Sequence, residues 1–77
     1  MSRPGYPFFI MDFTIELERE DDGRWIAEVA GMPGVMAYGQ TREQALAAVQ
    51  ALALRVIADR MEHNESPALL HLSFQAA

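Results

Sequence analysis

The sequence contains no cysteine, no lysine and no long hydrophobic run. Without cysteine, disulfides, thiolate metal sites and cysteine nucleophiles are excluded. The most apolar stretch near the N-terminus, residues 8–11, is too short for the core of a signal peptide, and no segment approaches the roughly 20 apolar residues that span a membrane. We therefore expect a cytoplasmic protein that does not contact membranes.

Positive charge is also scarce. Six arginines face eleven acidic residues, and the net charge is −5. Because nucleic-acid affinity comes largely from cations that contact phosphates, we expect no direct binding of nucleic acid. A basic protein is better matched to this charge through electrostatic steering.

The 77 residues form one domain, 1–77, with residues 1–7 as an irregular N-terminal arm that holds two prolines and a glycine. A chain of this size buries only about 60% of its unfolded surface, so we expect modest monomer stability and assembly into a homo-oligomer, a dimer or a tetramer. The apolar run 8–11 extends the first strand, swaps onto a neighbouring copy, or does both.

Alternating apolar and polar residues predict a strand from Asp12 to Glu18 and a returning strand over 24–29. Each strand has one apolar face, formed by Phe13, Ile15 and Leu17 in the first and by Trp25, Ala27 and Val29 in the second. Asp22-Gly23 predicts the hairpin turn between them, because both residues tolerate positive φ. Pro33-Gly34 predicts a type II turn before a short third strand over 35–38.

Thr41 and Gln44 have the spacing of a capping box, in which the threonine hydroxyl accepts from a backbone amide and the glutamine reaches back to the Thr41 N–H. The helix that starts here is expected to run to about His63, before Asn64 and Pro67. Its apolar residues recur at spacings of three and four: Ala45, Leu46, Val49, Leu52, Ala53, Val56, Ile57 and Met61.

A last strand is expected where apolar residues alternate again, with Leu70, Leu72 and Phe74 on one face and Leu69, His71 and Ser73 on the other. The predicted fold is α+β, a single β-β-β-α-β domain with one helix packed on one face of an antiparallel-rich sheet.

The order of these motifs resembles the HicB-like antitoxin family, the folded partners of toxin ribonucleases. The match covers residues 12–75. It begins with a strand, followed by Asp-Gly-Arg-Trp, a second strand, Pro-Gly and a third strand. A glycine and a threonine then precede the helix. The residues that carry the resemblance are Gly23, Trp25, Pro33, Gly34, Gly39, Thr41, Gln44 and Ala45.

The resemblance implies a partial ribonuclease H-like fold and a role in a toxin–antitoxin system. By resemblance, the chain binds a small basic HicA-like toxin endoribonuclease and covers its active face, without a cofactor and without catalysis of its own. Many family members also carry a C-terminal DNA-binding module. Because the chain stops at Ala77, we expect no such module here. The alternative is an orphan oligomeric HicB-like domain with a structural or interaction role.

Four residues on the predicted outward face of the sheet are the candidate partner-binding residues: Glu16, Glu18, Ile26 and Glu28. An apolar centre with a charged rim is typical of an interface, whereas the simpler interpretation is a solvated sheet face. Trp25 also fits a binding hot spot, but its position in the alternation favours the core.

No metal site or catalytic site is expected. His63 and His71 lack neighbouring residues that would complete a ligand set. Asp12, Glu16 and Glu43 are the one carboxylate trio compatible with a two-metal nuclease, and no motif brings them together.

Overall fold

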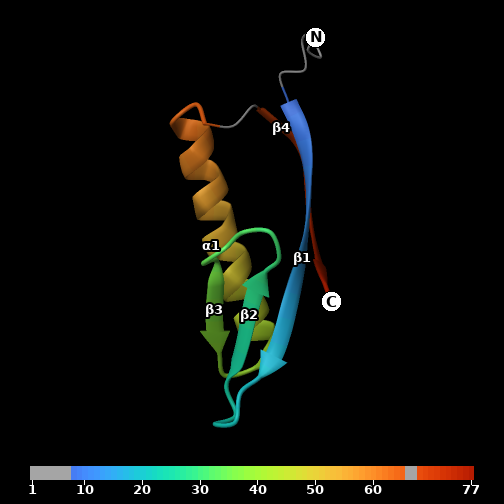
Figure 1. The fold of residues 1–77 in the computed structure, drawn as a ribbon, viewed down its shortest axis with the longest axis vertical. Helices are drawn as coiled ribbons and strands as arrows, with labels where there is room; N and C mark the ends of the chain where they lie inside the picture. Colours follow the sequence, from blue (N-terminus) through green and yellow to red (C-terminus); the bar gives the residue numbers. More distant parts are fainter. Residues whose placement is uncertain (1–7, 66–67) are drawn as a thin grey trace.

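The computed structural model describes residues 8–65 and 68–77, and it confirms the α+β class and the β-β-β-α-β order. The predicted arm 1–7 and Pro67 lie outside these residues. The elements, in chain order, are β1 (Phe8–Arg19), β2 (Trp25–Val29), β3 (Met36–Gly39), α1 (Arg42–Glu62) and β4 (Ala68–Ala76) (Figure 1).

The four strands form one mixed sheet in the order β3-β2-β1-β4. β1, β2 and β3 are an antiparallel meander, whereas β4 runs parallel to β1. Parallel neighbours need a long crossover connection, and α1 lies within the segment that joins β3 to β4. β1 begins at Phe8, which confirms that the apolar run 8–11 extends the first strand.

β1 has two different sets of partners along its length. Phe8–Ile15 pairs with β4, and Ile15–Arg19 pairs with β2. One end of the sheet is therefore a two-stranded parallel ribbon of β1 and β4, and the other end is the three-stranded meander (Figure 1).

The core lies between the meander and α1. The helix contributes Ala45, Val49, Ala53 and Ile57, which are four residues apart and buried. The sheet and its second loop contribute the other buried residues: Ile15, Ala27, Val29, Met32 and Val35. Trp25 is partly buried and packs against this cluster, which confirms its predicted place in the core.

The start of the helix follows the predicted cap with one difference. Thr41 is the N-cap, and its Oγ1 accepts from the Gln44 N–H at 3.1 Å. The Gln44 side chain, however, accepts from the N–H of Gln40 at 3.0 Å, so the predicted bond to Thr41 N–H was wrong by one residue. The helix ends at His63 as C-cap, followed by Asn64 with φ 58°.

Both predicted turns are present. Gly34 has φ 85° and the Val35 N–H donates to the Met32 carbonyl, as a type II turn requires. In the first hairpin, Gly23 has positive φ (92°), whereas Asp22 does not. Asp22 instead accepts from the backbone N–H of Arg24 at 3.0 Å, which makes the aspartate side chain part of the turn.

The predicted face of Leu70 was also wrong. The pairing of β1 with β4 shifts register between Phe9 and Ile10, where Leu69 and His71 are the partners and Leu70 is the extra residue. Because this bulge changes the alternation, Leu69 packs against the core and Leu70 is 63% exposed. Leu72 and Phe74 lie on the inner face as predicted.

Candidate partner-binding face

The face of the sheet turned away from α1, here called the outer face, brings the four candidate binding residues together. Glu16 of β1 lies opposite Glu28 of β2, and Glu18 lies opposite Ile26. In an antiparallel pair, residues directly opposite have Cβ atoms about 4.5–5.5 Å apart. The alternation in the sequence therefore predicted both the face and its members.

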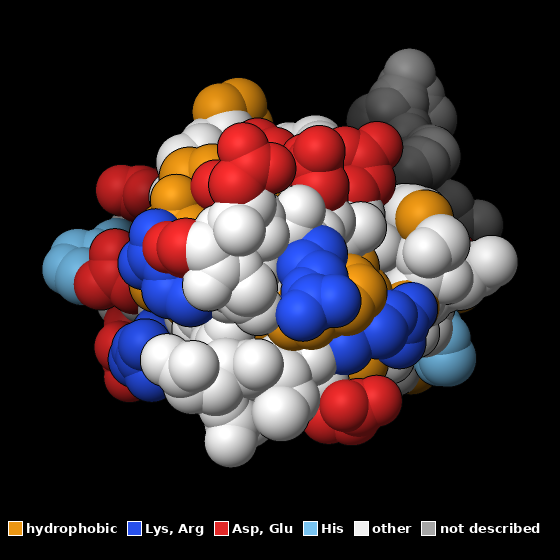
Figure 2. All heavy atoms as spheres, turned by 90° about the horizontal axis from the view of Figure 1, so that it is seen from below, with side chains coloured by type: hydrophobic (Ala, Val, Ile, Leu, Met, Phe, Trp, Pro, Cys, Tyr) orange, Lys and Arg blue, Asp and Glu red, His pale blue; other side chains and the backbone are white. Residues whose placement is uncertain are grey.

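These residues line a shallow hollow of about 320 Å³. Its lining consists of Glu16, Leu17, Glu18, Glu20, Ile26 and Glu28. Ile26 is half-buried, whereas Glu16, Glu18 and Glu28 are exposed. Figure 2 views the molecule from the hairpin end and shows acidic side chains gathered along one side.

Within the part of the chain that the structure describes, the glutamates of the hollow form no ion pair. The ion pair there joins Arg24 to Asp22, and the rings of His63 and His71 lie within 4 Å of the Asp59 and Asp12 carboxylates. Like charges directly opposite each other, as at Glu16 and Glu28, destabilise a sheet. The hollow is thus a concentration of negative charge that a cationic group from outside would relieve.

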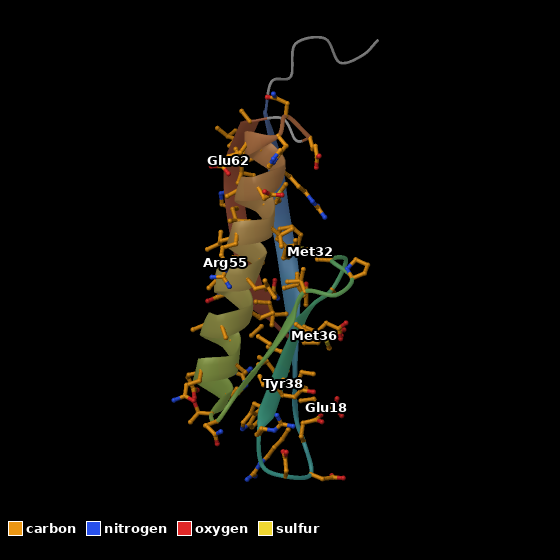
Figure 3. The ribbon with its side chains drawn as sticks, turned by 90° about the vertical axis from the view of Figure 1, so that its left-hand side faces the viewer. Glu18, Met32, Met36, Tyr38, Arg55 and Glu62 are labelled. Carbon is orange, nitrogen blue, oxygen red and sulfur yellow. The ribbon has the colours of Figure 1, made fainter. Side chains whose placement is uncertain are left out.

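Two exposed apolar residues that were not among the predicted binding residues lie beside the hollow. Met36 lies opposite Glu28 and Tyr38 opposite Ile26, so β3 continues both rows of the outer face. They are 41% and 48% exposed. Figure 3 shows them with Glu18 on the sheet side of the molecule, away from the helical residues Arg55 and Glu62. The alternation within residues 35–38 was the signal that could have found them.

Arg24 lies at the hairpin end of the hollow, where it contacts both Tyr38 and Asp22. Its guanidinium carbon lies 4.3 Å from the centre of the Tyr38 ring, and its Nε donates to Asp22 Oδ2 at 2.8 Å. The pKa of Asp22 is lowered from its ordinary 3.8, chiefly by the hydrogen bond from the Arg24 backbone N–H and further by the bond and the charge of the Arg24 side chain. Arg24 thereby connects the turn to Tyr38.

The three carboxylates considered for a two-metal nuclease are divided between the two sides of the sheet. Asp12 and Glu16 are on the outer face of β1, whereas Glu43 is in the first turn of α1, on the other side of the sheet. Within residues 8–65 and 68–77, no three His, Asp or Glu side chains are grouped to hold a metal ion. His71 Nε2 lies 3.8 Å from Asp12 Oδ1, and His63 Nδ1 lies 2.7 Å from the Asp59 carbonyl oxygen.

The chain is similar to UPF0150 protein Ta0767 of Thermoplasma acidophilum. The two sequences are 27% identical over 55 residues, which cover 71% of this chain and 80% of that protein. No protein-family model matches the sequence, and no solved structure matches the chain. The similarity supports a distant relationship to this small protein.

Among the described residues, no helix combines the length and the apolar character needed to cross a membrane.

Proposed function

We propose that this chain is an antitoxin-like binding protein that neutralises a small basic toxin ribonuclease by covering its active face with the outer face of the sheet. The observation that carries the proposal is the hollow, where Glu16, Glu18 and Glu28 surround Ile26. A basic partner would place lysine or arginine side chains among these carboxylates, and the same cations would then be unavailable for binding RNA.

Two further features support a protein partner. Ile26 in the hollow and Met36 and Tyr38 beside it form an apolar patch next to the glutamates, and an apolar patch with a polar rim is typical of a protein interface. The distant similarity to a UPF0150 protein and the HicB-like order of motifs agree with an antitoxin-like role. In this function the antitoxin acts by steric and electrostatic occlusion and performs no chemistry.

The test is co-expression with the product of the small reading frame beside this gene. The proposal predicts that the neighbouring product arrests growth when expressed alone. It also predicts that this chain restores growth and co-purifies with that product. The Glu16→Gln/Glu28→Gln variant should lose both effects, because it removes the facing pair of charges. Glu62→Gln/Glu65→Gln, which changes the net charge equally at exposed positions, should retain them.

If the neighbouring product is harmless and does not co-purify, the antitoxin proposal fails. The chain is then an oligomeric domain with a structural or interaction role.

A further inference from the structure

The ribbon of β1 and β4 is the least protected part of the fold. Among residues 8–65 and 68–77, β4 pairs with β1 alone and its second edge is open, and the nine residues from Ala68 to Ala76 contain no Asp, Glu, Lys or Arg. Proteins usually protect an open edge strand with charges, proline, short length or a cover. β4 carries one bulge, at Leu70, and runs regularly from there to Ala76.

The apolar side chains of the ribbon are also incompletely covered. The fully buried residues belong mainly to α1, the meander and its second loop, whereas Phe13, Leu72 and Phe74 are half-buried. The rings of Phe13 and Phe74 stack with their centres 5.9 Å apart. A two-stranded ribbon is marginally stable by itself, so this end of the sheet would gain from a further strand.

We propose that β4 pairs with β4 of a second copy, antiparallel about a two-fold axis, so that two sheets join into one. Each copy carries a net charge of −5, so two copies repel each other wherever their acidic side chains meet. They can therefore associate most easily through a surface that has no acidic side chains. The edge of β4 offers both copies a long contact without acidic side chains. The glutamates of the hollow lie on the part of β1 that pairs with β2, away from this edge.

The backbone determines which groups face the second copy. The Ala77 N–H donates to the Ile15 carbonyl at 2.9 Å, so the N–H groups of alternate residues, 75 and 73, also point toward β1. The N–H and C=O groups of Leu72, Phe74 and Ala76 therefore point to the open edge. Pairing centred on Phe74 places Phe74 opposite its own copy and Leu72 opposite Ala76. In this register, the inner faces of the two copies lie on the same side of the joined sheet. The paired residues do not include the bulge at Leu70.

In this arrangement the apolar side chains of Leu72 and Phe74 from both copies meet on the inner face and cover the half-buried ends of the two cores. The two-fold axis stands perpendicular to the sheet, so the two outer faces point the same way. The dimer would present two acidic hollows on one side.

Proline substitutions at two neighbouring positions test this pairing. Ala76→Pro removes an N–H that faces the second copy, whereas Ala77→Pro removes the N–H that bonds to β1. In sedimentation equilibrium, the wild-type chain should be a dimer, and Ala76→Pro should raise the dimer dissociation constant by about tenfold or more. Ala77→Pro should leave dimerisation nearly unchanged and lower the melting temperature instead.

Hydrogen exchange gives a second readout that requires no variant. The Leu72 and Phe74 amides should exchange slowly in concentrated wild-type protein and faster on dilution. A monomeric wild-type chain would overturn the proposal. Exchange rates at these amides that do not depend on protein concentration would also overturn the proposal. Equal dissociation constants for the two proline variants would overturn it as well. None of these results depends on whether a toxin binds the outer face.

Discussion

At Gly39 the backbone of β3 passes so close to the first turn of α1 that a side chain has no room. A Cβ atom placed there would lie 2.4 Å from the Ala45 nitrogen and 2.8 Å from the Gln44 carbonyl carbon. These are backbone atoms, so relief requires the strand or the helix to move. The glycine is required by this close approach, because its φ is not among the positive values found at Gly23, Gly31 and Gly34.

Gly39→Ala should therefore lower the free energy of unfolding by about 1–3 kcal/mol, as overpacking does, and Gly39→Val should lower it further. Urea denaturation measures both. Gly31→Asn is the control, since Gly31 has open space around it and asparagine tolerates positive φ. Equal stability of Gly39→Ala and the wild-type chain would show that the two backbones do not approach in this way.

The Asp22 carboxylate gives the hairpin a pH dependence of known sign. Its pKa in the folded chain is lowered, first by the Arg24 backbone N–H and then by the Arg24 side chain. The contribution of Asp22 to stability is therefore present above its unfolded pKa and is lost as the pH falls through the lower, folded pKa.

NMR titration of the Asp22 side-chain carbon should give a midpoint below 3.8. Arg24→Gln should move the midpoint only part of the way back, because the backbone N–H at residue 24, the larger cause, remains. A midpoint in the wild-type chain at or above 3.8 would contradict the observed turn.

The helix is the element whose limits depend most on single side chains. Thr41 Oγ1 satisfies the Gln44 N–H, one of the first-turn amides that have no partner within the helix. Thr41→Ala should cost about 1 kcal/mol of stability, measured by thermal or urea denaturation. Thr41→Ser keeps the hydroxyl and should cost much less. If both variants match the wild-type chain, the helix does not depend on this cap.

Elements with local signals were predictable from the sequence. The alternation around Ile15 and Val29, the Pro33-Gly34 turn and the threonine cap each act over a few residues, and their predictions were confirmed. The parallel pairing of β1 with β4 joins residues about sixty positions apart, and no local pattern specifies its register. The bulge at Leu70 follows from that pairing, which is why the alternation assigned this leucine to the wrong face.

The same distinction holds for the candidate site. Glu16, Glu18, Ile26 and Glu28 share a face because of strand parity, which the sequence shows directly. Met36 and Tyr38 join that face only through the register of β2 with β3. The 4.3 Å contact of Arg24 with Tyr38 likewise depends on how the hairpin folds back, which neither residue type specifies.

On the scale of the whole molecule, the two ends of the sheet differ in charge and in how completely their apolar side chains are buried. The meander carries the acidic hollow on its outer face and the buried core beneath it, whereas the ribbon has an uncharged open edge. Under the two proposals, this separation would let one surface bind a basic partner while another surface joins two copies.

The most direct test of the proposed function is the affinity of the purified chain for a small basic protein encoded beside its gene, measured by isothermal titration calorimetry at low and high salt. We expect Glu16→Gln/Glu28→Gln to weaken binding by about tenfold or more at low salt and to reduce its salt dependence. Glu62→Gln/Glu65→Gln should bind like the wild-type chain. Equal affinity of the wild-type chain and both variants would contradict a binding role for the acidic outer face.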